Sequence, residues 1–471
     1  MKNQERKIAN SGIWSDSIEL RKFLILAAVF FLVIGGYTVI KELKDFVFIN
    51  IVGLRELNYA KMLSMVVLIP LVFLYSRFVD LLRRHQLIYL YSIIYGLGGI
   101  IFAYFLGHPT IGLANTMQSS SRLFGWFFYF FIEGYQPFVI SLIWAFVNSI
   151  TRAEDVQNGY VVVTASSKIG GALTAALAWF YLNSRYVSCE PMSVGSYQLI
   201  MVAASCMLLL VPFVIFFLMK KIPASHMHGY EAVYKFEKKH EKELKKQEGS
   251  LKENLVSMFS GLYILFRYPY LLGVFGMIFF WEIVNVIFNF IRLSVGQAAA
   301  HTPTEFCAFL YGQICLFHLV GLVFVLLGTR NFIRWFGERK SLIAVPLLIG
   351  AVICYYLTVR TATAAALAYI VLRAINYAFA YPLRESLYIP TTKAAKFKTK
   401  SWIDGFGAKL SKSFGSCYNI IVSSVASSLL FSVHIVFFAG VIGLWTLVAN
   451  WLGRRFETAV KNNEVIGVEE I

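Results

Sequence analysis

The chain has 471 residues, of which 58% are hydrophobic and only 15% are charged, and its formal net charge is +17. Because soluble domains rarely exceed ~50% apolar residues, this composition excludes an ordinary soluble protein and predicts a membrane protein. The basic residues occupy short segments between apolar stretches and form no basic face on a soluble domain, which argues against a nucleic-acid partner.

Apolar segments begin after a polar start of 22 residues. No short apolar stretch with a small-residue cleavage site precedes the first of them, so we expect no cleaved signal peptide. Each segment offers the roughly 20 apolar residues that a helix needs to cross the hydrocarbon layer. In chain order, the twelve predicted spans are 23–50, 58–80, 86–107, 123–150, 157–183, 196–219, 268–293, 304–328, 341–359, 362–388, 401–427 and 430–452.

Lysine and arginine residues predict the orientation of these spans. The central segment 220–257 alone holds nine lysines, whereas the segments on the opposite side hold little beyond Arg55, Arg185 and Arg360. By the positive-inside rule, both termini are expected in the cytoplasm. We predict an all-α membrane protein with two pseudo-symmetric six-helix bundles, as in major-facilitator transporters. Its expected parts are an N-terminal segment (1–22), a first bundle (23–219), a basic cytoplasmic linker (220–257), a second bundle (258–452) and a tail (453–471).

Charged residues interrupt several predicted spans, most clearly the first. Lys41, Glu42, Lys44 and Asp45 all lie within it. An ionisable side chain at bilayer depth costs at least ~2.5–3.5 kcal/mol, so it is tolerated where it faces water, an opposite charge or a substrate. Lys41 is three residues from Lys44 and four from Asp45, so these side chains share one helix face. Further cations on other spans indicate a polar cavity for an anionic cargo.

Charged residues also recur between the two halves. The three pairs are Lys168 and Lys412 at a spacing of 244 positions, Lys44 and Arg292 at 248, and Glu133 and Glu385 at 252. Both members of the first pair stand in an SKxxG pattern. The nearly common spacing predicts a duplicated bundle in which the members of each pair are counterparts.

Three blocks of the sequence carry further motifs. They are YTVIKELKDFVFI in the first span, EGYQPFVISLIWAFVNSIT in the fourth, and YIPTTKAAKFKTKSWIDGFGAKLSKSFGS, which covers the loop before the eleventh span and part of that span. Together they resemble the ATP/ADP translocase family of obligate intracellular bacteria and plastids. The resemblance implies a nucleotide transporter and assigns Lys44, Glu133 and Lys412 to the family's functionally important charged positions. The seventh span departs from the family pattern, because 287–292 contains no glutamate and Glu282 lies too far upstream to match it.

A nucleotide is an anionic cargo of the kind that the cations on the predicted spans indicate. A di- or triphosphate carries roughly three or four negative charges, and cationic side chains can replace its hydration with charge-assisted hydrogen bonds. The candidate phosphate-binding residues are Lys41, Lys44, Lys168, Arg292 and Lys412. The candidates for charge pairing or proton coupling are Glu42, Asp45, Glu133 and Glu385, and the additional candidates are Arg373, Arg384, Asn285, Asn289, Asp404 and Lys409.

Several of these residues also have a purely structural interpretation. Lys44 can pair with Glu42 or Asp45. Glu133 can pair with Lys168 across two helices, and Glu385 can pair with Arg384. In that interpretation the charges stabilise the bundle and take no direct part in transport.

The resemblance implies a carrier that exchanges host ATP for bacterial ADP by alternating access. Proton-coupled import of a nucleoside triphosphate is the alternative, with Glu133 and Glu385 as proton sites. The histidines and cysteines show no ligand or nucleophile spacing, so we expect no catalytic residue, no metal site, no cofactor and no enzyme activity. We expect a monomer in the bacterial inner membrane whose partners are the lipid bilayer and a nucleotide (ATP, ADP or another nucleoside triphosphate).

Overall fold

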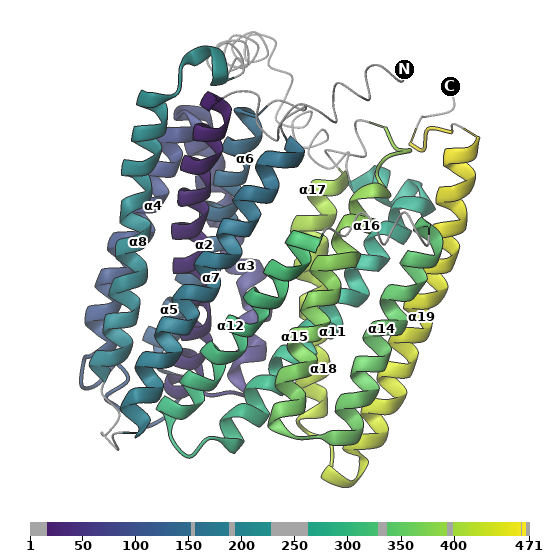
Figure 1. Ribbon diagram of the computed structural model, residues 1–471. Coiled ribbons are helices and arrows are strands. Elements are labelled where there is room, and N and C mark those ends of the chain that lie inside the picture. The colour runs from purple at the N-terminus through teal and green to yellow at the C-terminus, as the bar shows by residue number, and fades with distance from the viewer. Residues whose placement is uncertain are drawn as a thin grey trace. The chain divides into compact units, whose positions relative to one another are not determined.

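The computed structural model describes residues 17–151, 156–187, 194–227, 262–327, 337–392, 399–462 and 464–467. Within these ranges the chain is almost wholly helical (Figure 1), and the isolated bridge between Thr391 and Ile466 is the one β-type pairing. Nine of the described helices are long and apolar enough to cross a membrane. The predicted all-helical membrane fold is therefore confirmed.

The described helices follow the predicted spans in chain order. The first half comprises α2 (Ser17–Ile51), α3 (Glu56–Leu81), α4 (Arg84–Leu106), α5 (Leu123–Glu133), η1 (Gln136–Ile140), α6 (Ser141–Ser149), α7 (Val156–Val187), α8 (Val194–Lys221) and η2 (Ala224–Met227). The second half comprises α11 (Pro269–Ala299), α12 (Pro303–Leu327), α14 (Glu338–Val359), α15 (Ala362–Ile375), η3 (Asn376–Ala380), α16 (Tyr381–Ser386), α17 (Lys400–Trp402), η5 (Ile403–Gly407), α18 (Ala408–Val422) and α19 (Ser427–Lys461). When helices that continue through a π-helical turn are taken together, each predicted span has one described counterpart.

Within the residues that the structure describes, three spans contain a named π-helical turn, which is wider than an α-helical turn. The turn η1 lies in the fourth span, η3 in the tenth and η5 in the eleventh. Pro137 lies within η1, and Pro382 follows shortly after η3. Proline has no N–H to donate to the carbonyl four residues earlier, so a regular α-helix is disfavoured at both places. Such turns are frequent at functional sites.

The helix α2 begins at Ser17, six residues before the predicted start of the first span at 23. Contacts of the buried Lys22 side chain stabilise these additional residues. Lys22 Nζ lies 2.6 Å from a Glu19 carboxylate oxygen and donates to the backbone carbonyls of Ile150 at 3.0 Å and His226 at 3.1 Å. His226 Nδ1 also lies 3.2 Å from Glu19 Oε1. Because its charge is paired with Glu19 and its ammonium group is hydrogen-bonded, the Lys22 side chain can be buried in the protein interior.

Other helix ends also differ from the predicted bounds, and two of them lie in the last two spans. The last helix, α19, runs to Lys461 and not to 452, whereas α18 ends at Val422, before the predicted 427. Hydropathy marks where a helix meets hydrocarbon, whereas its hydrogen-bonded ends are set by the backbone and its caps. The predicted span boundaries therefore give the apolar middle of each helix and not its full length.

The chain forms two compact units. The first comprises Met1–Val52, Val67–Gln247 and Cys307–Leu326, and the second comprises Gly53–Val66, Glu248–Phe306 and Leu327–Ile471. The start of α3 thus belongs to the second unit, and most of α12 belongs to the first. The predicted division into bundles at 23–219 and 258–452 stays a prediction about the membrane architecture.

In the first unit, α2 lies side by side with α7 and α8 (Figure 1). Small residues allow this close packing, as is usual between membrane helices. Thr174 Oγ1 of α7 donates to the Gly35 carbonyl of α2 at 3.0 Å. Gly170 of α7 faces the α2 backbone so closely that a Cβ atom there would lie 2.5 Å from the Phe31 carbonyl oxygen.

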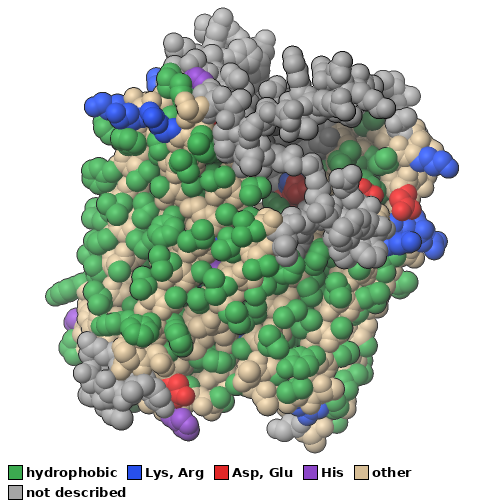
Figure 2. Space-filling model, in the orientation of Figure 1, with side chains coloured by type: hydrophobic (Ala, Val, Ile, Leu, Met, Phe, Trp, Pro, Cys, Tyr) green, Lys and Arg blue, Asp and Glu red, His purple; other side chains and the backbone are tan. Residues whose placement is uncertain are grey.

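Hydrophobic side chains are spread over much of the surface seen in the space-filling view (Figure 2). Large hydrophobic residues that are mostly exposed occur on long helices of the chain, for example Phe180 of α7, Phe213 of α8 and Val436 of α19. Exposed apolar side chains on long apolar helices are suited to contact with lipid.

The close contact at Gly170 generates a prediction about stability. Gly170→Ala is expected to lower the stability of the protein by about 1–3 kcal/mol, because the Phe31 backbone cannot move away from an added methyl group as a flexible side chain would. Gly440→Ala in α19 is the matched control, since a Cβ there meets nothing within 4 Å. The measurement is thermal unfolding of the purified protein in detergent. An equal effect of the two substitutions would contradict the prediction.

Candidate functional site

A buried charge cluster lies in the first unit where α2 meets α5. Lys44 of α2 is only 6% exposed. Its Nζ donates to Glu133 Oε2 of α5 at 2.8 Å and lies 3.6 Å from Asp45 Oδ1. The same ammonium group lies 4.3 Å from the centre of the Tyr129 ring of α5. Lys44 therefore links two helices through an ion pair and a cation–π contact.

A second ion pair lies one turn earlier on α2. Lys41 Nζ lies 3.1 Å from Glu42 Oε1, and the Glu42 side chain is fully buried whereas Lys41 is partly exposed. We call the whole group the first cluster: Lys41, Glu42, Lys44, Asp45, Tyr129 and Glu133. With its two lysines and three carboxylates ionised, the first cluster carries one net negative charge. Its cations are therefore already neutralised by its own side chains.

Two arginines, Arg292 (buried) and Arg373 (half-buried), meet at one ring in the second unit. Arg292 of α11 is fully buried, and its Cζ lies 4.1 Å from the centre of the Tyr369 ring of α15. Arg373, one turn further along α15, has its Cζ 4.6 Å from the same centre. Asn289 Oδ1 accepts a hydrogen bond from Arg292 at 3.1 Å, and Asn285 Oδ1 accepts one from Arg373 at 3.4 Å. These five residues form the second cluster.

The second cluster holds two like charges close together. The distances to the ring keep the two Cζ atoms within about 9 Å of each other, so at an effective dielectric of about 20 their repulsion is on the order of 2 kcal/mol. The ring and the amide oxygens stabilise guanidinium groups without cancelling their charge.

Glu282 lies next to the second cluster, although its position does not match the family spacing. Its Oε2 accepts a hydrogen bond from Asn285 at 3.1 Å and lies 3.9 Å from Lys412 Nζ of α18. One signal in the sequence points to it. Residues 282, 285, 289 and 292 recur at helical spacing, which makes a single polar stripe on the otherwise apolar α11.

Lys168 occupies a different environment in the first unit. Its Nζ lies 4.9 Å from the centre of the Phe317 ring, on the segment of α12 that belongs to this unit. Next to Phe317, His318 makes a buried hydrogen bond of 2.9 Å with Thr38 of α2. The predicted contact of Lys168 with Glu133 or a phosphate stays a prediction.

The remaining candidates lie near the junction of α16 and α17. Glu385 Oε2 lies 2.6 Å from Lys400 Nζ, so the structure pairs Glu385 with Lys400 and not with Arg384. Arg384 lies over the Tyr381 ring, with its Cζ 5.4 Å from the ring centre. The two other candidates in this region are Asp404, which is exposed in η5, and the half-buried Lys409 of α18.

The π-helical turns of the fourth and tenth spans are also separated by a nearly common spacing. The turn η1 starts at Gln136 and η3 starts at Asn376, a difference of 240 positions. The pairing of counterparts between the halves stays a prediction.

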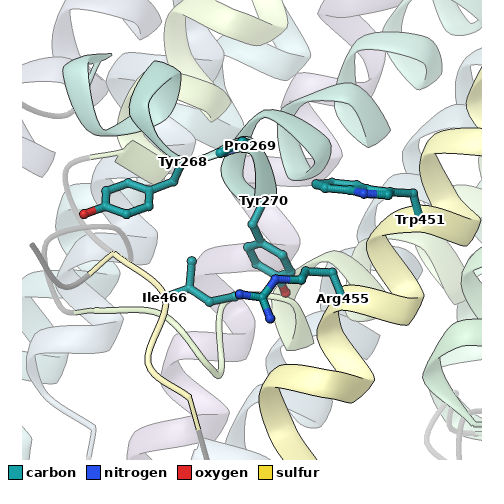
Figure 3. A pocket seen from close by; sticks show the side chains of 6 residues that line it. All are labelled: Tyr268, Pro269, Tyr270, Trp451, Arg455 and Ile466. Atoms are coloured by element: carbon teal, nitrogen blue, oxygen red, sulfur yellow. The ribbon is translucent and has the colours of Figure 1, made fainter. Parts of the chain in front are cut away.

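An apolar pocket of about 220 Å³ lies elsewhere in the second unit (Figure 3). Tyr268, Pro269, Tyr270, Trp451, Arg455 and Ile466 line it. Its one charged group, Arg455, forms an ion pair with Glu464 and lowers the pKa of that carboxyl by donating hydrogen bonds to it. Because none of the predicted site residues lines this pocket, we do not assign the substrate to it. Among the described residues, no group of three or more His, Cys, Asp or Glu side chains is placed to hold a metal ion.

Comparison with known proteins identifies related sequences along nearly the whole chain. A family model described as TLC ATP/ADP transporter matches residues 1–456. ADP,ATP carrier protein 4 of Rickettsia felis is 23% identical over 502 residues, covering 94% of this chain and 93% of the relative. ADP,ATP carrier protein 1 of Chlamydia trachomatis is 24% identical over 501 residues, covering 95% of this chain and 91% of the relative.

Solved structures show the same fold at low sequence identity. The crystal structure of a D-xylose-proton symporter has a TM-score of 0.59 and 13% identity, covering 92% of this chain and 96% of the symporter chain. A bacterial homologue of the lysosomal transporter Spinster has a TM-score of 0.58 and 11% identity, covering 94% of this chain and 99% of the homologue. The major facilitator superfamily proton:xylose symporter XylE has a TM-score of 0.56 and 14% identity, covering 95% of this chain and 96% of XylE. The fold is therefore that of the major facilitator superfamily.

The burial of the Lys44–Glu133 pair predicts strong coupling between the two residues. Lys44→Met and Glu133→Gln are each expected to cost about 3–5 kcal/mol of stability, and the double variant less than their sum, because a lone buried charge is worse than none. The more exposed pair of Lys400 and Glu385 is the control, with an expected coupling of about 0–1 kcal/mol. Unfolding by SDS in mixed micelles measures both double-mutant cycles. Equal coupling in the two cycles would disprove the role of burial.

Proposed function

Because the chain belongs to the TLC ATP/ADP transporter family, we propose that it exchanges ATP for ADP across a membrane by alternating access. The observation that carries this proposal is the family match over residues 1–456, with buried lysine and arginine side chains on helices that can span a membrane. Carrier proteins named for ADP and ATP in Rickettsia and Chlamydia align over more than nine tenths of the chain.

The buried cations suit the phosphate chain of a nucleotide. Phosphates lose their hydration when they enter a membrane protein, and charge-assisted hydrogen bonds from Lys and Arg replace it. We assign phosphate binding to Lys41, Lys44, Lys168, Arg292 and Lys412, with Arg373 as a further cation. The carboxylates of the first cluster hold its lysines in place when no phosphate is bound, and a bound phosphate competes with them for the lysines.

Exchange follows from the cost of moving unscreened charge. When the empty carrier reorients, the cations of its site become enclosed in an occluded state of low dielectric constant. Enclosing them there without an anion raises the free-energy barrier to reorientation. A bound nucleotide neutralises them and lowers that barrier, so the loaded carrier reorients more readily than the empty one. In this scheme a second nucleotide must bind before the carrier can return, which is exchange.

Proton-coupled import is the second candidate, and the charge balance of the first cluster supports it. Three carboxylates share two lysines there, so one carboxylate can accept a proton without leaving a lysine unpaired. Protonation of Glu133 would leave Lys44 paired with Asp45 alone, at 3.6 Å, and so able to bind a phosphate in place of Glu133. Nucleotide uptake by this mechanism would depend on a pH gradient. It would not require a nucleotide inside the vesicle.

The cellular setting is also part of the proposal. We place the protein in the bacterial inner membrane as a monomer, with both termini and the linker 220–257 in the cytoplasm, because most basic residues lie on that side. Its partners are the nucleotide and the bilayer. In this proposal ATP is cargo and is not hydrolysed by the protein.

Efflux from proteoliposomes distinguishes the two candidates. Vesicles loaded with labelled ATP are expected to release the label only when ADP or ATP is present outside, because the empty carrier does not return. Protein-free vesicles are the control for leakage. Release into nucleotide-free buffer at the same rate would refute exchange, and release that follows an imposed pH gradient would favour proton coupling.

Transport is further expected to need both Lys44 and Lys412. Replacing either residue by alanine removes a charge-assisted hydrogen bond worth roughly 1.5–3 kcal/mol, which corresponds to about a 10- to 100-fold weaker apparent affinity for ATP. The readout is the concentration dependence of ATP uptake. Lys461→Ala is the control, because Lys461 is exposed at the end of α19. Uptake with unchanged affinity by a folded Lys44→Ala or Lys412→Ala protein would remove that residue from the site.

A further inference from the structure

Two buried side chains of α12 contact α2 within one turn of Lys41. Tyr311 is fully buried, and its hydroxyl donates a hydrogen bond to the Val39 carbonyl of α2 at 3.0 Å. His318 is also buried, and its Nε2 lies 2.9 Å from Thr38 Oγ1 of α2. The segment of α12 that carries both residues belongs to the first unit, as α2 does. The helix α12 therefore contacts α2 at the place where the first cluster begins.

The hydroxyl of Thr38 decides the direction of its hydrogen bond with His318. Thr38 Oγ1 donates to the Ile34 carbonyl at 2.7 Å. A hydroxyl has one hydrogen, so its oxygen is the acceptor in the second contact. The Nε2 atom of His318 therefore carries a proton and donates to Thr38. Tyr311 and His318 thus both donate a hydrogen bond from α12 to α2.

The SKxxG pattern of the first half lies where α12 packs on α7. Its last residue is Gly171, where a Cβ atom would lie 2.5 Å from Cε1 of His318. Glycine therefore leaves the room that the imidazole ring needs at this position. Lys168, the second residue of the pattern, lies over the ring of Phe317, the neighbour of His318. The pattern thus accommodates the part of α12 that contacts α2.

We propose that His318 and Tyr311 are positioning residues, which fix the rotation of α2 about its axis and so direct Lys41 toward the phosphate groups of the substrate. This inference rests on the proposed nucleotide exchange and adds two residues to its site. Both act on the nucleotide through Lys41 and need not touch it.

The contacts explain how residues of α12 act through Lys41. The Lys41 side chain is partly exposed, whereas its ion-pair partner Glu42 is fully buried. A rotation of α2 would move the long Lys41 side chain away from a bound phosphate. A carbonyl oxygen has two lone pairs, so Val39 can accept from Tyr311 in addition to an N–H group of its own helix. Two donors from one neighbouring helix to adjacent residues of α2 hold that helix in one rotation.

Variants that remove each donor test the proposal. His318→Leu and Tyr311→Phe are each expected to weaken the binding of ATP about 3- to 10-fold, the effect of losing one hydrogen bond. His318→Gln keeps an N–H donor and is expected to restore most of the affinity. Tyr270→Phe is the matched control, since the buried Tyr270 hydroxyl donates to the Leu387 carbonyl at 2.7 Å in the second unit. The readout is the ATP-dependent rise in melting temperature of the full-length protein in detergent.

A double-mutant cycle with Lys41 distinguishes positioning from a merely structural role. In a Lys41→Ala background, His318→Leu is expected to cost no further affinity for ATP, because the lysine through which His318 acts is absent. A structural role would lower the affinity by the same factor in both backgrounds, which would overturn the inference. Unchanged affinity in His318→Leu and Tyr311→Phe, or an equal loss in Tyr270→Phe, would overturn it too.

The outcomes also separate this inference from the proposed function. Wild-type protein that binds ATP but does not exchange it for ADP in proteoliposomes would refute the proposed function, and the affinities of the variants would still decide the inference. Exchange by the wild-type protein together with unchanged affinities in the variants would overturn the inference alone. The melting temperature without ATP shows whether each variant is folded. Should His318→Leu fail to fold, Gly171→Ala takes its place, because the added methyl group displaces the His318 ring.

Discussion

The need to pair every buried charge governs this structure. A lysine or glutamate at membrane depth is stable only with a partner, and each partner fixes the position of a helix. Lys44 thus holds α5 against α2 through Glu133, and Lys22 holds the start of α2 against the chain near Ile150 and His226. Helix packing, the placement of the candidate site and the proposed transport cycle all depend on these pairs.

Much of this arrangement could be predicted from the sequence. Each predicted span has a helical counterpart among the described residues. Hydropathy is informative here because exposing polar groups to lipid is costly, so a membrane helix appears in the sequence as a long run of apolar residues. Hydropathy also placed Lys41, Lys44 and Asp45 inside one long helix, and the structure has all three in α2. That they share one face of this helix stays a prediction from helical spacing. The resemblance in three short blocks was confirmed by a family match along nearly the whole chain.

The partners of the charges could not be predicted in the same way. Glu385 pairs with Lys400, and Glu282 lies beside Asn285 and Lys412, because the meeting of distant helices decides these contacts. The π-helical turns are a second feature that helical periodicity does not predict. One widened turn rotates all the residues that follow it relative to those before it, so a face assigned from regular 3.6-residue spacing does not continue through η1 or η3.

The unbroken length of α2 has a mechanical consequence. The anchor at Lys22 and the charge cluster at Lys44 lie on the same 35-residue helix, with no π-helical turn between them. At 1.5 Å per residue they are about 33 Å apart along the helix axis. Because one continuous helix carries both, a tilt of α2 at its Lys22 end would displace the buried charges at Lys44 as well.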